Sequence, residues 1–291
     1  MPASVRPPGD AALGPARRPP STSPRPARRR GPSAAVWAVA GLGLALLVLP
    51  LVAVLIRTPW GMLGGLVARA DVLQALVLSL LTAAISTVLC LVLGVPLAIV
   101  LARAEAWPAV PRRLLRAAVT IPMVLPPVVG GIALLMLLGR SGVLGAALAA
   151  VGITVPFTTG AVVIAQTFVA MPFLVFAVEG ALRASDRRAE AAAATLGATP
   201  FQVFRLITVP SVAPGIAAGA VLCFARALGE FGATITFAGS FPGTTRTLPI
   251  ASYLALESDP DEAIALALVL IAVSVAVLLA LRDRWLPGVR G

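Results

Sequence analysis

Lysine and histidine are both absent from this chain of 291 residues, and all 23 of its basic residues are arginine. Without lysine the chain cannot form the phosphate-binding loop of P-loop ATPases, in which a lysine reaches the phosphates. Without histidine it lacks the base of a serine hydrolase triad and the commonest zinc ligand. We therefore expect no catalytic residue, no metal site and no cofactor in this chain.

Cysteine and aspartate are scarce as well. The two cysteines, Cys90 and Cys223, both fall within apolar runs, where we interpret them as small packing residues. The six aspartates lie in the N-terminal tail, in loops or at the ends of apolar runs. An aspartyl intramembrane protease needs two aspartates in facing spans, so this distribution argues against a membrane enzyme.

Hydrophobic residues make up 59% of the chain and charged residues only 12%. The hydrophobic residues gather in runs longer than the roughly 18 residues that mark a bilayer-spanning helix, and the alternating segments of a β-barrel are absent. The predicted fold class is an all-α, multi-pass protein of the cytoplasmic membrane with six transmembrane helices. The predicted spans are 34–56, 72–102, 114–138, 160–181, 211–237 and 263–281.

The arginines are distributed unevenly between the two sides of these spans. If the N-terminus is cytoplasmic, 18 of the 23 arginines lie in cytoplasmic segments and four lie outside, while Arg226 falls within a span. Cytoplasmic loops of membrane proteins carry such an excess of basic residues. We therefore predict that both termini are cytoplasmic.

The sequence predicts four segments. Residues 1–32 contain seven arginines and nine prolines, a composition typical of a disordered tail. Residues 33–70 hold the first transmembrane helix and an outer loop, residues 71–285 a transmembrane domain of five helices, and residues 286–291 a C-terminal tail. The net charge of +11 reflects this basic tail, which we expect to contact membrane lipid rather than nucleic acid.

One polar segment interrupts the second half of the chain, with the sequence RRAEAAAATLGATPFQVFRLITVP at residues 187–210. Ser185 or Asp186 is suited to cap a short helix that runs to about Leu196. Gly197 favours the left-handed backbone conformation that ends such a helix.

A second short helix is predicted directly after this elbow. Thr199-Pro200-Phe201-Gln202 combines an N-cap threonine, a proline at the first helical position and a glutamine that completes a capping box. Pro210 is expected to end this helix before the next span. Residues 185–210 are therefore predicted to form a helix–elbow–helix unit of fixed shape.

The spacing in this segment resembles the EAA loop of ABC importer permeases, which reads E-A-A, three residues, Gly, nine residues, Ile, one residue and Leu-Pro. Here nine residues separate Gly197 from Ile207, and Val209-Pro210 follows after one more; Glu190 stands seven rather than six residues before Gly197. The resemblance implies a type I ABC importer permease whose loop couples to a separate ATPase subunit that binds ATP and Mg²⁺. The residues implied in coupling are Glu190, Ala191, Ala192, Gly197, Ala198, Thr199 and Pro200.

Residues 71–281 resemble the molybdate permeases of this superfamily. The resemblance is carried by SLLTAAISTVLCLVLGVPLAIVLAR at 79–103, GAVVIAQTFVAMPF at 160–173 and FARALGEFGATITFAGSFPGTTRTLPIASYLALE at 224–257. Sulfate permeases share the GEFGA portion at 229–233. The resemblance therefore implies an oxyanion importer, with molybdate as the expected substrate and sulfate, thiosulfate or tungstate as alternatives.

Arg226 and Glu230 are charges within the predicted span 211–237, where an arginine costs about 2.5 to 3.5 kcal/mol on insertion scales. Their spacing of four residues places them on one helix face, where they can pair. In one interpretation Arg226 lends positive potential to an anion path or gate; in the other the pair is an internal strut. The remaining residues predicted to line the path are Gly229, Gly232, Thr234 and Thr236.

Prolines interrupt the predicted span 114–138 at Pro122, Pro126 and Pro127. Such breaks occur where backbone is buried or lines a cavity, and the freed N–H groups suit an oxyanion. The alternative is a simple kink. On the outer side, residues 243–247 form a polar, turn-rich segment that is either a solvated loop or a contact for an extracytoplasmic binding protein.

The resemblance implies further partners and leaves other classes open. Permeases of this kind work in pairs, so we expect a homodimer that binds two ATPase subunits and an extracytoplasmic oxyanion-binding protein. An ATP-independent channel or carrier would leave the helix–elbow–helix unexplained. A membrane scaffold would leave Arg226 within a span unexplained.

Overall fold

The computed structural model describes residues 33–186 and 188–285, so the predicted tails 1–32 and 286–291 lie outside the described residues. Every regular element in the described part of the chain is a helix. The described part of the chain divides into two units, one ending at Leu49 and the other beginning at Pro50.

Five helical segments in the described residues are long and apolar enough to cross a membrane. They contain α1 (Ala34–Arg57), α3 (Ala70–Arg103), α7 (Thr159–Ala184), α10 (Val209–Leu228) and α13 (Pro260–Trp285). A bent pair of shorter helices makes a sixth candidate span. The prediction of an all-α, multi-span membrane protein is confirmed, and four of the predicted spans match α1, α3, α7 and α13 closely.

The predicted span 114–138 is not one continuous helix, as its prolines indicated: the structure divides it into α4 (Ala109–Val124) and α5 (Pro127–Leu138), bent by 117°. The break falls at Leu125 and Pro126, whose backbones are extended. A proline lacks the N–H that would continue the helical ladder and disfavours helical geometry in the preceding residue. Pro122, by contrast, lies inside α4.

The predicted span 211–237 is also wrong as a single helix. Helix α10 ends at Leu228, and α11 (Gly232–Ala238) begins after a break of three residues. Phe231 at this break has φ −127° and ψ −56°, outside the helical region. The break sits within an apolar run, so the hydropathy of the sequence alone did not reveal it.

Several shorter helices connect the long ones. They include α2 (Trp60–Ala68), the 3₁₀ turn η1 (Ala104–Ala106), α6 (Gly145–Ala150) and α12 (Leu248–Ser258). Helix α2 occupies the segment in which an outer loop is predicted. The boundaries predicted between segments remain predictions.

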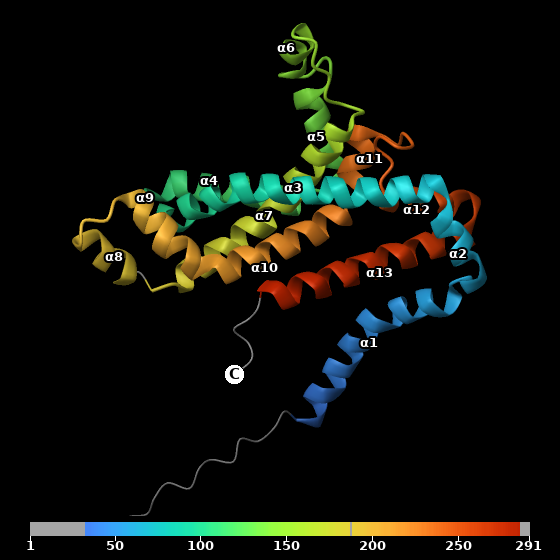
Figure 1. The fold of residues 1–291 in the computed structure, drawn as a ribbon, viewed down its shortest axis with the longest axis horizontal. Helices are drawn as coiled ribbons and strands as arrows, with labels where there is room; N and C mark the ends of the chain where they lie inside the picture. The colour runs from blue at the N-terminus through green and yellow to red at the C-terminus, as the bar shows by residue number, and fades with distance from the viewer. Residues whose placement is uncertain (1–32, 187, 286–291) are drawn as a thin grey trace, which may run out of the picture. The chain divides into compact units, whose positions relative to one another are not determined.

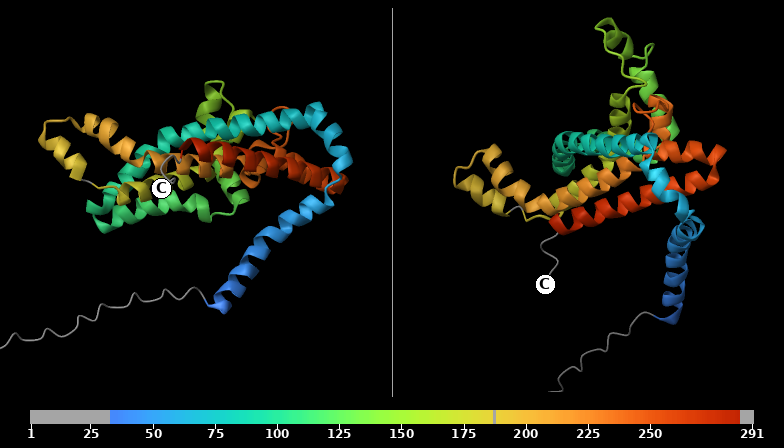
Figure 2. Two further views of the ribbon diagram at one scale, coloured as in Figure 1. Left: turned by 60° about the horizontal axis from the view of Figure 1, so that its bottom comes forward. Right: turned by 45° about the vertical axis from the view of Figure 1, so that its right-hand side comes forward.

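Helices α3, α7 and α10 lie side by side within the second unit, and α5 and α11 project together from them (Figure 1, Figure 2). Small side chains allow the three long helices to approach one another closely. Ala83, Cys90, Ala170, Cys223 and Ala227 are all completely buried in their shared core. Both cysteines are free thiols in this core, as expected for small packing residues.

Candidate functional site

The helix–elbow–helix predicted at residues 185–210 is present in the structure. It consists of α8 (Arg188–Thr195), the elbow at Gly197 with φ +86°, and α9 (Pro200–Val203). The Thr199 hydroxyl accepts the Gln202 N–H at 3.3 Å, and the Gln202 side chain accepts the Thr199 N–H at 2.8 Å. This capping box and the left-handed glycine define the shape of the elbow.

The prediction that Pro210 ends the second helix is wrong. Helix α9 continues through η2 (Phe204–Thr208), a π-helical turn, directly into α10, where Pro210 occupies the first turn. In the π turn the N–H of Val209 bonds to the carbonyl of Phe204, five residues earlier. This wider register accommodates the proline, which has no N–H to donate, so the segment 200–228 is helical throughout.

Glu190 joins the two arms of the elbow. Its Oε1 accepts a hydrogen bond of 2.6 Å from the hydroxyl of Thr208, which is buried in η2. The Ser211 hydroxyl donates to the Thr208 carbonyl at 2.8 Å, and Ser185 lies within hydrogen-bond distance of Ser211. The role of Thr208 was missed in the sequence, because a threonine in a helical run gives no indication of its partner 18 residues away.

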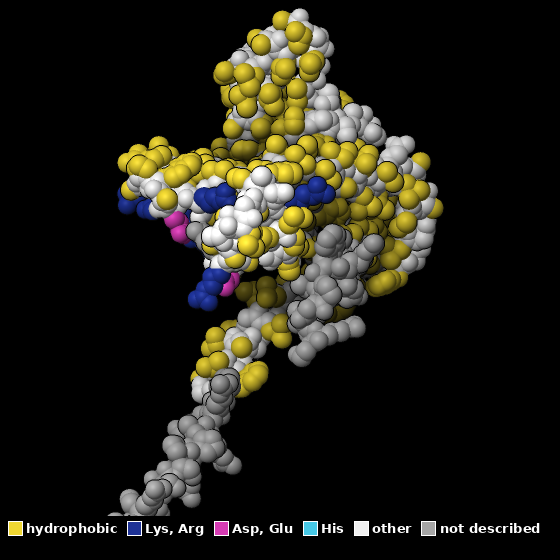
Figure 3. Space-filling view, turned by 60° about the vertical axis from the view of Figure 1, so that its left-hand side comes forward, with side chains coloured by type: hydrophobic (Ala, Val, Ile, Leu, Met, Phe, Trp, Pro, Cys, Tyr) yellow, Lys and Arg dark blue, Asp and Glu magenta, His cyan; other side chains and the backbone are white. Residues whose placement is uncertain are grey.

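The outer face of this segment carries exposed apolar side chains. Leu196, Phe201 and Leu206 are 88%, 66% and 68% exposed, and Ala191 and Ala192 are exposed beside them. Figure 3 shows this end of the molecule, with hydrophobic and arginine side chains together on its surface. Clustered apolar groups next to charged ones are typical of a surface that contacts another protein.

The break between α10 and α11 is held by the predicted ion pair. Arg226 contacts Glu230 at 2.7 Å, and the Glu230 side chain is 1% exposed against 28% for Arg226. The other Glu230 oxygen accepts the N–H of Ala233 at 2.8 Å. Glu230 therefore lies in the break itself, where it caps α11 and pairs with the last turn of α10.

The two broken helices meet at this point. A Cβ on Gly232 would come within 2.7 Å of Pro127 at the start of α5, and a Cβ on Gly131 would come within 2.8 Å of the Ala233 carbonyl. The backbones of α5 and α11 thus touch. Gly229, in contrast, has room for a side chain.

The two path threonines differ in their hydrogen bonds. Thr236 donates to the Gly232 carbonyl within α11 at 2.8 Å. Thr234 is completely buried, and its hydroxyl has no hydrogen-bond partner among the described residues. The structure therefore gathers the predicted path residues of α10 and α11 around the break, where Gly232 packs on Pro127.

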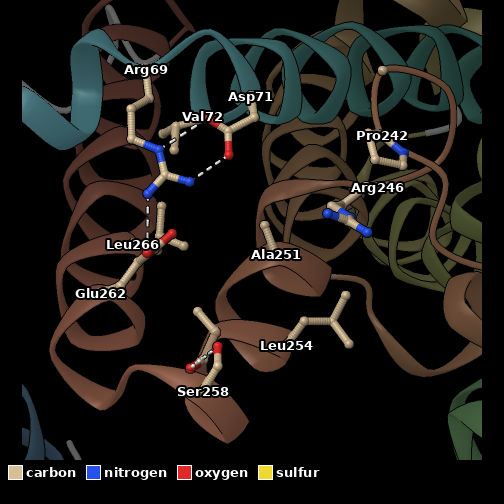
Figure 4. Close-up of a pocket in the computed structure, with 12 residues that line it drawn as sticks. Arg69, Asp71, Val72, Pro242, Arg246, Ala251, Leu254, Ser258, Glu262 and Leu266 are labelled. Atoms are coloured by element: carbon tan, nitrogen blue, oxygen red, sulfur yellow. Dashed lines mark hydrogen bonds and ion pairs between the residues drawn. The ribbon is translucent and has the colours of Figure 1, made fainter.

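A pocket of about 280 Å³ lies at the opposite end of α3 from the elbow, beside the loop 243–247 (Figure 4). Arg69 contacts Asp71 at 2.6 Å and Glu262 at 3.0 Å, and these hydrogen bonds raise the pKa of Arg69 above its ordinary value. Arg246 lines the same pocket and donates to the Ser240 hydroxyl at 3.0 Å. The loop itself is a tight turn in which the buried Thr245 hydroxyl accepts the Phe241 N–H at 2.9 Å.

Sequence reasoning missed one buried charge. Glu179 in α7 has a side chain only 4% exposed, and it pairs with Arg116 of α4 and with Arg183 at 2.9 Å. The signal was present, because a glutamate inside an apolar run, four residues before an arginine, is a polar group in a membrane span. This cluster joins α4 to the end of α7.

The fold and these features define a class: the membrane-spanning permease of a type I ABC importer. The solved structure of a bacterial ABC transporter involved in the import of the acidic polysaccharide alginate matches it with a TM-score of 0.65, at 18% identity over 87% of this chain and 96% of that chain. This similarity concerns the fold. The long apolar helices of the chain are those of a multi-pass membrane protein.

The chain belongs to the family described as binding-protein-dependent transport system inner membrane component, whose model matches residues 94–290. It is 51% identical over 229 residues to the molybdenum transport system permease protein ModB of Mycobacterium tuberculosis, covering 79% of this chain and 86% of that protein. It is 42% identical over 191 residues to ModB of Escherichia coli K12, covering 65% and 82%.

Proposed function

We propose that this chain is the permease subunit of an ABC importer that carries molybdate across the cytoplasmic membrane. The observation that carries this proposal is the 51% identity to a molybdenum transport permease over 79% of the chain. A separate ATPase subunit supplies ATP and Mg²⁺, an extracytoplasmic binding protein delivers the anion, and two copies of the chain form the path. The chain itself performs no catalytic step.

The helix–elbow–helix is suited to transmit the ATPase motion. Its elbow is defined by a left-handed glycine and a capping box, and Glu190 links α8 to the start of α10 through Thr208. A segment tied at both ends passes on a displacement that a flexible loop would absorb. In this proposal Ala191, Ala192 and Phe201 contact the ATPase, and α10 receives the movement.

The break at residues 229–231 is suited to act as the gate. It lies at the far end of α10 from the elbow, so movement of α10 acts directly on the Arg226–Glu230 pair and on α11. Discontinuous helices of transporters commonly lie at the substrate site. Alternating access then exposes the path first to the binding protein and afterwards to the cytoplasm.

The proposal is tested by uptake of labelled molybdate into vesicles that contain the chain, its ATPase and its binding protein. ATP-dependent uptake that resists excess sulfate is expected. Strong competition by sulfate would indicate a sulfate permease. Competition by tungstate as strong as that by unlabelled molybdate would indicate that both oxyanions are substrates. Uptake without ATP would contradict the importer class and support a channel or carrier.

Gly197→Pro tests the coupling segment, because proline cannot adopt the φ of +86° found at this position. Gly152→Pro is a matched control: this glycine also has a positive φ, of +80°, open space around it and a hydrogen-bonded N–H, but it follows α6. We expect Gly197→Pro to abolish ATP-dependent uptake and Gly152→Pro to retain it. Equal loss in both variants would contradict the coupling role.

A further inference from the structure

A second charged pocket, of about 270 Å³, lies where α3 ends and α4 begins. Four arginines and one glutamate line it together with Leu101. They are Glu105, Arg112, Arg113, Arg116 and Arg183. Neither the transport path nor the coupling segment contains these residues, so the pocket calls for a separate explanation.

The pocket carries an excess of positive charge. Glu179 behind it neutralises part of the charge of Arg116 and Arg183, and Glu105 contacts Arg183 at 3.2 Å. Arg112 donates to the Glu105 carbonyl at 3.3 Å but, like Arg113, has no carboxylate partner among the described residues. Four arginines therefore face two carboxylates, which leaves the equivalent of two positive charges for a ligand.

Exposed apolar side chains stand near the pocket residues in the sequence. Trp107, just before α4, and Val110 and Leu114 in its first two turns are 43%, 67% and 65% exposed. The apolar span of α3 ends at Arg103, next to the pocket, so these side chains lie at the level where the membrane interior meets its surface. Tryptophan is enriched at this level, and arginines there contact lipid head groups.

We propose that this pocket binds the phosphate group of an anionic phospholipid, with the acyl chains along the exposed apolar residues of α4. Arginines recognise phosphate by charge-assisted and bidentate hydrogen bonds. A free inorganic anion would neutralise the arginines but leave Val110 and Leu114 exposed. A lipid does both, because its phosphate pairs with the arginines and its acyl chains cover the apolar side chains. Glu179 of α7 pairs with Arg116 of α4. A lipid bound in this pocket would therefore also stabilise the packing of α4 on α7.

The test uses the purified full-length chain in detergent, with native mass spectrometry of bound lipid. We expect it to retain one phosphatidylglycerol in preference to phosphatidylcholine. Arg112→Gln combined with Arg113→Gln is expected to lower this preference about 30-fold at low salt, because each arginine near an anionic lipid surface contributes about 1 kcal/mol. These two arginines are chosen because they do not hold the buried Glu179.

Two control variants separate binding from other effects. Arg112→Lys with Arg113→Lys keeps the charge and is expected to retain most of the preference. Arg188→Gln with Arg205→Gln removes the same charge from two exposed arginines outside the pocket and is expected to leave lipid retention unchanged. Equal lipid loss in this second control would overturn the proposal in favour of general surface charge.

Two further outcomes would also overturn the proposal. Displacement of the lipid by an equal concentration of inorganic phosphate would identify the ligand as a free anion. Loss of ATPase binding in the Arg112→Gln, Arg113→Gln variant, with lipid retention intact, would identify the pocket as a protein contact. The measurement requires no transport activity, so its failure is distinct from a failure of the proposed function.

Discussion

Arg226 and Glu230 either belong to the anion path or gate or form an internal strut, and one set of variants distinguishes these two interpretations. Glu230 is 1% exposed and Arg226 28% exposed, so the two halves of the pair are not equivalent. Arg226→Met leaves a buried carboxylate without its cation, which costs about 3 to 5 kcal/mol. Glu230→Gln leaves a partly hydrated arginine, and the glutamine oxygen can still accept the Ala233 N–H, so about 1 kcal/mol is expected.

The double variant completes the cycle. Arg226→Met with Glu230→Gln contains no unpaired buried charge, so its stability should return to within about 1 to 2 kcal/mol of the wild type. The assay is thermal unfolding of the purified chain, followed by uptake of labelled molybdate with the ATPase and binding protein. An internal strut predicts that uptake follows stability across all three variants.

A role for Arg226 in the anion path predicts a different pattern. Glu230→Gln should then retain uptake, whereas Arg226→Met and the double variant should both lose it, even though the double variant has regained stability. A larger loss of stability in Glu230→Gln than in Arg226→Met would contradict the burial of Glu230 as the cause of the cost. A double variant that showed the full sum of the two losses would contradict the pairing of the two charges.

Three other predictions follow from the described contacts. Gly232→Ala forces a Cβ to 2.7 Å from Pro127 and should destabilise the chain by about 1 to 3 kcal/mol in thermal unfolding, whereas Gly229→Ala should have little effect. Thr208→Val removes the donor to Glu190 and should lower ATP-dependent uptake about tenfold, and Thr208→Ser should retain it. Arg69→Gln breaks two exposed ion pairs and should cost under about 1 kcal/mol, a difference that vanishes at high salt. Because its pKa is raised, Arg69 stays charged up to about pH 12, so this contribution should not change between about pH 5 and 9.

Local chemistry made the elbow predictable from the sequence. Gly197, Thr199, Pro200 and Gln202 act through bonds within a few residues, and each adopts the predicted conformation or hydrogen bond. Pro210 was misjudged, because the π turn before it accommodates the missing N–H and the helix continues. The π turn of η2 depends on residues that carry no such signal.

The buried charges were predictable only in part. Arg226 and Glu230 stood out in the sequence as charges within an apolar run, and the pairing expected from their spacing is present. The helix break at this point was not predicted, although Gly229 and Gly232 flank Glu230 and glycine is unfavourable inside a helix. Glu179 and Arg116 are 63 residues apart in the chain and meet only through the packing of α4 on α7.

The sequence by itself determined that this is a helical membrane protein, where its apolar runs lie and how its elbow is built. These properties depend on hydrophobicity, charge and capping, which act over short stretches of chain. Only the tertiary structure decided that α10 ends at Leu228, that Thr208 holds Glu190, and that α5 and α11 meet through Gly131 and Gly232. These features arise from contacts between distant segments, whose energies depend on packing geometry that no local pattern encodes.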